Sequence, residues 1–153
     1  MLAVTKEFTF DCAHVLSYHE GLCKNLHGHT YKLQVEVGRT AWSPELPEMD
    51  GMVIDFKVLK MIVTSEIISR FDHAFIYWGE GADKFEVELA TIIKKFDARI
   101  VELGFRPTAE NMAEFFYKKL AASFAHVGIE MVAIRLWETP TSYAEVRNEI
   151  WRS

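Results

Sequence analysis

The chain has 153 residues, of which half are hydrophobic and a quarter are charged, and its formal net charge at pH 7 is −5. This composition is typical of one globular domain, which we expect to span residues 1–153, and a negative charge without a Lys/Arg run argues against a nucleic-acid-binding surface. No apolar run is long enough to cross a bilayer, and two cysteines without a secretory signal favour free thiols, so we expect a cytoplasmic protein that binds no membrane.

Hydrophobic residues alternate with polar ones in two segments that we expect to be strands, Leu2–His14 and His29–Thr40. In each segment the apolar positions share one face, and this face carries a histidine at one end. His14 ends the first segment and His29 begins the second. An antiparallel hairpin would therefore bring the two histidines together across the loop formed by residues 15–26.

A further histidine stands two positions before the second strand. His27 and His29 point to the same side of an extended chain, so their imidazoles would join that of His14. Three nitrogen ligands with an open fourth position are the arrangement of a catalytic zinc site, whereas four protein ligands close a structural one. Cys23 leaves both alternatives open: as a bound thiolate it would close the site, and as a free thiol beside a cation it would serve as a base or nucleophile. His19 breaks the alternating pattern, and we interpret it as a solvated loop residue.

The middle of the chain is expected to begin with a proline-containing loop, Ala41–Asp50, and to continue with an amphipathic helix. Asp55 is a suitable N-cap, and apolar residues at helical spacing extend to about Arg70. Asp72 and His73 follow directly. The pair has two interpretations: a capped histidine at the C-terminal end of the helix, or an imidazole held by a carboxylate and used in proton transfer.

The next segment contains a predicted helix, Lys84–Phe96, and a predicted short strand, Ala98–Leu103. A second long helix follows, because Thr108 is a good N-cap and the apolar residues after it recur at helical spacing. Glu110 lies in the first turn of this helix, where the helix dipole favours a negative charge, so its position has a structural explanation.

Two further strands are expected near the C-terminal end, Glu130–Thr139 and Ser142–Trp151, and they would form a hairpin. The apolar row of the first of these strands ends at Glu138. This carboxylate is either a solvated strand end or a buried group that needs polar partners. The pattern as a whole predicts an α+β fold: a four-stranded antiparallel sheet with two long helices on one face, and an extra helix and short strand inserted between His73 and Thr108.

Five motifs stand in a fixed order along residues 5–147: Ala13-His14, Cys23-x-x-x-His27-Gly28-His29, Asp72-His73, Pro107-Thr108-Ala109-Glu110-Asn111 and Glu138-Thr139-Pro140. Together they resemble the family of 6-pyruvoyl-tetrahydropterin synthase and 6-carboxy-tetrahydropterin synthase. The resemblance implies the tunnelling fold, in which subunits join their sheets into a barrel and two trimers stack into a homohexamer. Sheet edges that a single subunit leaves uncovered agree with such an assembly. The segment Tyr77–Phe105 departs from the commonest pattern of the family.

The resemblance also implies which residues act. The expected zinc ligands are His14, His27 and His29; the expected catalytic residues are Cys23, Asp72, His73 and Glu138; and the expected substrate-binding residues are Glu138 and Thr108. In the family, the aspartate and the histidine come from a neighbouring subunit and relay protons with the motif cysteine, while the glutamate anchors the pterin ring. Active sites would therefore lie at subunit interfaces.

The implied substrate is 7,8-dihydroneopterin triphosphate. We expect its zinc-dependent conversion to 6-carboxy-5,6,7,8-tetrahydropterin with release of acetaldehyde and triphosphate, because the stretch Glu138–Tyr143 resembles bacterial members that feed deazapurine (queuosine) synthesis. A 6-pyruvoyl-tetrahydropterin synthase, which eliminates triphosphate and keeps the whole side chain, is the alternative within the family. An alternative of another class is a non-catalytic oligomer that binds zinc or a pterin, with Cys23 as the fourth zinc ligand.

Overall fold

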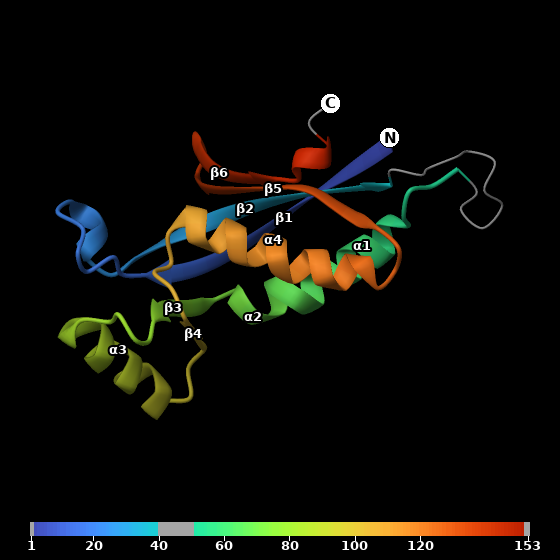
Figure 1. Cartoon of the computed structure of the whole chain (residues 1–153). Helices are drawn as coiled ribbons and strands as arrows, with labels where there is room; N and C mark the ends of the chain where they lie inside the picture. The colour runs from blue at the N-terminus through green and yellow to red at the C-terminus, as the bar shows by residue number, and fades with distance from the viewer. Residues whose placement is uncertain (1, 40–50, 152–153) are drawn as a thin grey trace.

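The computed structural model describes residues 2–39 and 51–151 (Figure 1). Within these residues, six strands form one mixed sheet in the order β4-β3-β1-β2-β5-β6. The strands are β1 (Leu2–His14), β2 (His27–Arg39), β3 (Ala74–Trp78), β4 (Ile100–Leu103), β5 (Glu130–Thr139) and β6 (Ser142–Arg147). The helices are α1 (Phe56–Val63), α2 (Ser69–Phe71), α3 (Lys84–Lys95) and α4 (Ala109–Ala125), with a π-helical segment (Thr64–Ile68) between α1 and α2 and 3-10 turns at Leu22–Lys24 and Glu149–Trp151. None of the helices in the described part is long and apolar enough to span a membrane.

The antiparallel part of the sheet is built on the hairpin of β1 and β2. The two strands pair along their whole length and place His14 opposite His27, so the predicted hairpin is confirmed. β5 pairs with β2 and β6 pairs with β5, both antiparallel, which completes the predicted four strands. The second strand begins at His27 rather than at His29. The expected strand end at Thr40 and the expected loop Ala41–Asp50 lie outside the described residues.

Two further strands extend the sheet beyond the predicted four. β3 lies parallel to the C-terminal end of β1, and β4 lies parallel to β3, so the prediction of a purely antiparallel, four-stranded sheet is wrong. Sequence reasoning missed β3 because Ala74–Trp78 is a continuous apolar run without alternation. Such a run is typical of a parallel strand that is covered on both faces. The strand predicted at Ala98–Leu103 is present in shorter form as β4.

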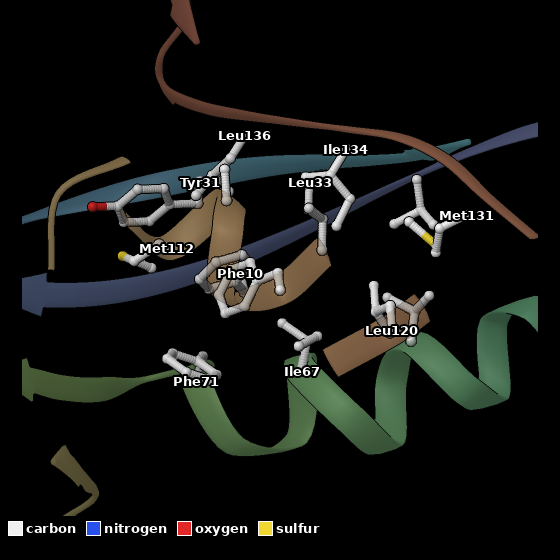
Figure 2. Packing of buried hydrophobic residues seen from close by; sticks show 14 of the residues in the cluster. Phe10, Tyr31, Leu33, Ile67, Phe71, Met112, Leu120, Met131, Ile134 and Leu136 are labelled. Atoms are coloured by element: carbon white, nitrogen blue, oxygen red, sulfur yellow. The ribbon is translucent and has the colours of Figure 1, made fainter. Parts of the chain in front are cut away.

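The main hydrophobic core lies between the sheet and the helices α1, α2 and α4, which cover one of its faces (Figure 1). Phe10 and Tyr31 stack with their ring centroids 5.3 Å apart, and Phe71 and Phe116 approach Phe10 edge-on. Figure 2 shows the sheet residues Phe10 and Tyr31 facing Ile67 and Phe71 of the helical layer. Each fully buried side chain of this size contributes roughly 1.5–3 kcal/mol to folding. The core thus gives firm support to Tyr31, which lies close to the histidines.

Helix α3 lies on the opposite face of the sheet from α1 and α4. Val15, Phe75, Tyr77 and Ala90 form a second buried cluster with it, while Ile76, from the same strand as Phe75, belongs to the main core. Successive side chains of a strand point to opposite faces, so the two clusters lie on the two sides of β3. The expectation of two long helices on one face therefore holds for α1 and α4, and the inserted helix covers the other face.

The ends of the elements have local chemical causes. The carboxylate of Asp55 accepts the backbone N–H of Lys57 at 2.7 Å and caps α1, as predicted. The helical path then continues through the π-helical segment to Phe71, close to the expected end. The last strand was expected to reach Trp151, but β6 ends earlier because the side chain of Asn148 accepts the N–H of Ile150 at 3.0 Å and turns the chain.

Candidate metal centre

Three imidazoles meet at one end of the β1–β2 hairpin, as the sequence predicted. The Nε2 atoms of His14 and His27 are 3.0 Å apart, and one ring nitrogen of each of His14, His27 and His29 lies within 4.8 Å of the other two. The strand register explains the convergence: His14 pairs with His27, and His29 lies two positions along on the same face of β2. Among the described residues, Cys23 is not part of this group.

Backbone carbonyls orient two of these rings. Nδ1 of His14 donates to the carbonyl of Pro107 at 2.9 Å, and Nδ1 of His27 donates to the carbonyl of Asn25 at 2.8 Å. A carbonyl can only accept, so the proton of each neutral ring lies on Nδ1 and the lone pair lies on Nε2. Burial, with smaller contributions from the neighbouring His27 and His29, lowers the pKa of His14 to about 4, although the hydrogen bond to the Pro107 carbonyl raises it. His14 is therefore neutral at pH 7, the form that binds metals.

The group fits a metal cation. Two Nε2 lone pairs face each other at 3.0 Å in His14 and His27, an arrangement that is repulsive unless a positive charge lies between them. Nε2 of His29 is buried and has no hydrogen-bond partner within the described residues. Burial also lowers the pKa of His29, although the nearby Glu138 raises it. A buried polar atom without a partner is costly, and coordination to a cation would satisfy it.

Glu138 lies beside the three histidines and is held by a hydrogen bond that the sequence did not suggest. Its Oε1 atom is 3.8 Å from Nε2 of His14 and 3.7 Å from Nε2 of His29. The hydroxyl of Tyr31 donates to the same oxygen at 3.2 Å. Burial raises the pKa of Tyr31, so its hydroxyl stays protonated and remains a donor. The side chain of Glu138 is 29% exposed, so it is a partnered carboxylate that an incoming ligand can still reach.

Cys23 lies in a short 3-10 turn of the loop between β1 and β2. Its carbonyl accepts the N–H of Leu16 at 2.9 Å, which closes the base of the loop. The thiol is half-buried, and it is free, as is that of Cys12. Burial raises the pKa of Cys12 to about 12, which leaves Cys12 an unreactive core residue. His19 is exposed and accepts the N–H of Gly21 at 2.8 Å, in agreement with its interpretation as a loop residue.

Asp72 and His73 form a contact that extended geometry does not predict. The Nδ1 atom of His73 is 2.9 Å from Oδ1 of Asp72. Neighbouring side chains of an extended chain point apart, but His73 has φ of +61°, which turns its ring back toward Asp72. Such a conformation costs about 1–2 kcal/mol in a residue other than glycine. The backbone of Asp11 stabilises it, because its carbonyl accepts the N–H of His73 at 2.6 Å and its N–H donates to Asp72 at 3.0 Å.

The charge of this pair is set by its neighbours. The N–H of Asp11 lowers the pKa of the Asp72 carboxyl, as do His73 and the more distant guanidinium of Arg99. Arg99 also donates to two carbonyls at the end of the helix, those of Ser69 at 3.1 Å and of Asp72 at 2.8 Å. Asp72 is therefore a carboxylate at neutral pH, and it can hold and orient the imidazole of His73.

The Asp72–His73 pair and the three histidines lie on opposite faces of the sheet. His14 shares its face of β1 with the core residues Phe10 and Cys12, whereas Asp11 points to the other face and gathers with Asp72 and His73. A groove of about 560 Å³ lies on that other face, beside α3, and its lining includes Asp11, Thr30, His73, Phe75, Ile93 and Arg99. Within one chain, the sheet thus separates His73 from the candidate metal centre.

The remaining predicted residue, Thr108, has a structural role in the described fold. Its hydroxyl accepts the N–H of Asn111 at 3.4 Å and caps α4, and it is half-buried. The neighbouring Pro107 contributes the carbonyl that holds His14. Glu110 is exposed in the first turn of α4. A side-chain motif could not reveal the part played by Pro107, because the group involved belongs to the main chain.

A mixed sheet with helices on both faces and a three-histidine centre at one end defines a small α+β protein with a candidate metal site. The family model described as 6-pyruvoyl tetrahydropterin synthase matches residues 3–149. The chain therefore belongs to the 6-pyruvoyl tetrahydropterin synthase family.

Similar proteins agree with this assignment. The chain is 43% identical to a 6-carboxy-5,6,7,8-tetrahydropterin synthase of Haemophilus influenzae over 95% of this chain and 98% of that protein. It is 36% identical to the 6-carboxy-5,6,7,8-tetrahydropterin synthase of Aquifex aeolicus over the same shares of the two chains. Among solved structures, the 6-pyruvoyl tetrahydropterin synthase of Plasmodium falciparum superposes with a TM-score of 0.65 at 21% identity, covering 96% of this chain and 97% of that one, which supports the fold.

Proposed function

We propose that this protein converts 7,8-dihydroneopterin triphosphate and one water molecule to 6-carboxy-5,6,7,8-tetrahydropterin, acetaldehyde and triphosphate. The observation that carries the proposal is the group of three imidazoles beside Glu138, in a chain 43% identical to a 6-carboxy-5,6,7,8-tetrahydropterin synthase over nearly its whole length. Both parts are needed, because a three-histidine site alone fits many reactions.

We propose that the metal is zinc and that His14, His27 and His29 hold it. Three imidazole nitrogens and one open position suit a catalytic zinc site, and the two carbonyls that orient His14 and His27 are typical outer partners of such ligands. When bound, zinc would act as a Lewis acid toward the oxygens of the substrate's side chain. In this proposal Cys23 stays outside the zinc shell, and an X-ray absorption spectrum with a sulfur ligand would contradict it.

Glu138 is the proposed anchor of the pterin ring. A carboxylate can accept two parallel hydrogen bonds from the 2-amino group and the adjacent ring N–H, which fixes both position and orientation. The hydroxyl of Tyr31 holds one carboxylate oxygen from the core side, so the carboxylate is oriented before the ligand arrives. With the ring held there, the side chain of the substrate would extend past the histidines. Thr108, which caps α4 beside Pro107, is the second proposed substrate-binding residue.

Cys23, Asp72 and His73 are the proposed proton-transfer groups. As a thiolate, Cys23 would remove a proton from a side-chain carbon of the substrate. His73, held by Asp72 at 2.9 Å, would return protons and help the triphosphate to leave. The two parts belong to different subunits in this proposal, and the support for that is the sheet, which within one chain separates His73 from the three histidines. The assembly we propose is the homohexamer expected from the family resemblance, with each active site at a subunit interface.

An active site formed by residues of two subunits leads to a direct prediction for mixed oligomers. Cys23→Ala and His73→Ala are each expected to lower turnover by orders of magnitude when pure. Because each variant keeps the part that the other lacks, subunits exchanged between them should form some complete sites and regain activity. If the mixture stays inactive although mass spectrometry detects mixed oligomers, the two residues do not act across an interface.

Product analysis tests the reaction itself. The zinc-loaded protein is incubated with 7,8-dihydroneopterin triphosphate, acetaldehyde is assayed, and the pterin is identified by mass, with His27→Ala as the metal-free control. Acetaldehyde together with a carboxypterin is the expected result. A 6-pyruvoyl product would instead assign the other reaction of the family, which the family model's description keeps as the second candidate. No conversion would favour a non-catalytic protein that binds zinc or a pterin.

A further inference from the structure

Arg106 makes cation–π contacts with two aromatic rings near the candidate metal centre. Its guanidinium carbon lies 4.6 Å from the ring centroid of Tyr18 and 5.5 Å from that of Trp78. Tyr18 belongs to the loop between β1 and β2, Trp78 ends β3, and Arg106 lies between β4 and α4, so three separate elements meet at this point. Over residues 2–39 and 51–151, no carboxylate forms an ion pair with Arg106.

Arg106 directly precedes a residue that supports the candidate metal centre. The residue that follows it, Pro107, provides the carbonyl that binds Nδ1 of His14 at 2.9 Å. The loop that provides Tyr18 also carries Cys23. An anion bound by Arg106 would thus lie near the centre, beside the loop that holds the proposed base.

The loop that carries Tyr18 and the indole of Trp78 are both anchored by the surrounding structure, while the Tyr18 side chain itself is 68% exposed. The hydroxyl of Ser17, the neighbour of Tyr18, donates to Oε2 of Glu86 at 2.6 Å. Glu86 is only 3% exposed and also receives the N–H of Asp83, so it ties the loop to the first turn of α3. On the other side, the backbone at Gly81 passes so close to the Trp78 indole that any side chain at Gly81 would overlap it. The inserted segment therefore anchors the loop that carries Tyr18 and also provides the Trp78 ring.

The geometry leaves the guanidinium able to bind an oxyanion. The cation–π contacts engage the charge of the guanidinium and use none of its five N–H donors. These donors match the oxygens of a phosphate and can bind two of them at once. The protein has a formal net charge of −5, so a triphosphate needs a local cation to offset the general repulsion. An arginine with no carboxylate partner in the described part of the chain is suited to this task.

We propose that Arg106, oriented by Tyr18 and Trp78, binds the triphosphate group of the substrate and releases it as product. This inference rests on the proposed function for the identity of the ligand. It gives the inserted segment a role in binding: β3 ends at Trp78, which contacts Arg106, and α3 anchors the loop of Tyr18 through Glu86. Arg106 is a binding residue in this assignment, and it takes no part in proton transfer.

Calorimetric titration with inorganic triphosphate tests the subsite without turnover. We expect the zinc-loaded variant Arg106→Met to bind triphosphate at least tenfold more weakly than the unmodified protein, a loss of about 1.4 kcal/mol. Arg106→Lys keeps the charge and loses the planar donor set, so we expect an intermediate affinity. Arg70→Met is the matched control, because Arg70 also lies over an aromatic ring, that of Phe71 at 5.7 Å, but is placed in α2. The control should bind triphosphate normally.

Kinetics with the pterin substrate provide the second measurement. Arg106→Met should raise KM about tenfold and change kcat much less, because the triphosphate is held in the ground state as well as in the transition state. Tyr18→Leu removes one of the two aromatic rings and leaves the charge of Arg106, so it should give a smaller rise in KM than Arg106→Met. Thermal melting checks that each variant is folded.

The outcomes separate this inference from the proposed function. If the unmodified protein turns over the substrate but folded Arg106→Met and Arg106→Lys bind triphosphate as tightly as it does, the phosphate subsite is wrong and the reaction stands. If the protein makes neither pterin product but its triphosphate affinity depends on Arg106, the reaction is wrong and the anion site stands. If the unmodified protein does not bind triphosphate at all, the inference is overturned.

Discussion

Removal of the Tyr31 hydroxyl tests how the carboxylate of Glu138 is oriented. In Tyr31→Phe the ring keeps its stacking on Phe10 at 5.3 Å, and the hydroxyl that donates to Glu138 at 3.2 Å is lost. Glu138 is 29% exposed, so water can solvate the oxygen that the hydroxyl leaves. We therefore expect the free energy of unfolding to fall by only about 1 kcal/mol, the usual net effect of one hydrogen bond.

The effect of Tyr31→Phe on substrate binding should be larger than its effect on stability. Without the hydroxyl, the carboxylate of Glu138 is free to rotate and must be reordered when the pterin ring binds. A hydrogen bond to a charged group contributes roughly 1.5–3 kcal/mol, and losing its lower value would raise KM about tenfold. Zinc content should not change, because the carbonyls of Pro107 and Asn25 still orient their rings. Steady-state kinetics, chemical denaturation and metal analysis of the same preparation measure the three quantities.

Tyr117→Phe is the matched control for this experiment. The hydroxyl of Tyr117 donates to the carbonyl of Met131 at 3.3 Å in a partly buried position, so the same atom is deleted from a different place. We expect a similar small loss of stability and an unchanged KM. If both variants have the KM of the unmodified protein, Tyr31 does not position Glu138, and the reasoning about a carboxylate oriented before the ligand arrives is refuted.

Four further changes test other parts of the structure. His27→Ala should lose zinc, because two imidazoles make a weak site, and metal analysis of the purified variant measures this. Cys23→Ala should keep its zinc and its melting temperature while turnover falls by about a thousandfold, and unchanged turnover would remove Cys23 from the mechanism. Leu120→Ala, in a fully buried position of α4, should lower the free energy of unfolding by about 2–5 kcal/mol, measured by denaturant titration. Glu86→Ala should lower stability by about 1–3 kcal/mol through the loss of its buried hydrogen bonds, and faster hydrogen exchange in residues 15–26 would report the freed loop.

The hairpin and its histidines could be predicted because local pattern and function coincide there. The alternation that defines β1 and β2 also places His14 and His29 on the apolar face, and strand pairing then brings them together. The caps at Asp55 and Thr108 were equally local, since each side chain binds an N–H two or three residues further on. Such features depend on a few neighbouring residues and are readable without a structure.

The features that sequence reasoning missed depend on contacts between distant segments or on the backbone. β3 joins the sheet beside β1, where Cys12 pairs with Ala74, and the continuous apolar run of β3 does not indicate which distant strand it joins. The contact between Asp72 and His73 follows from the positive φ of His73, which no side-chain pattern predicts. The link from Tyr31 to Glu138 needs β2 beside β5, although the position of Tyr31 two residues after His29 was a visible signal.

The carbonyls that hold His14 and His27 have a consequence for mutagenesis. An alanine scan removes side chains, but residues 25 and 107 keep their carbonyl oxygens whatever side chain they carry. A scan would therefore report both positions as tolerant although the tautomers of His14 and His27 depend on them. Only a change in the path of the main chain, such as a deletion in the turn before His27 or in the approach to α4, would expose their contribution.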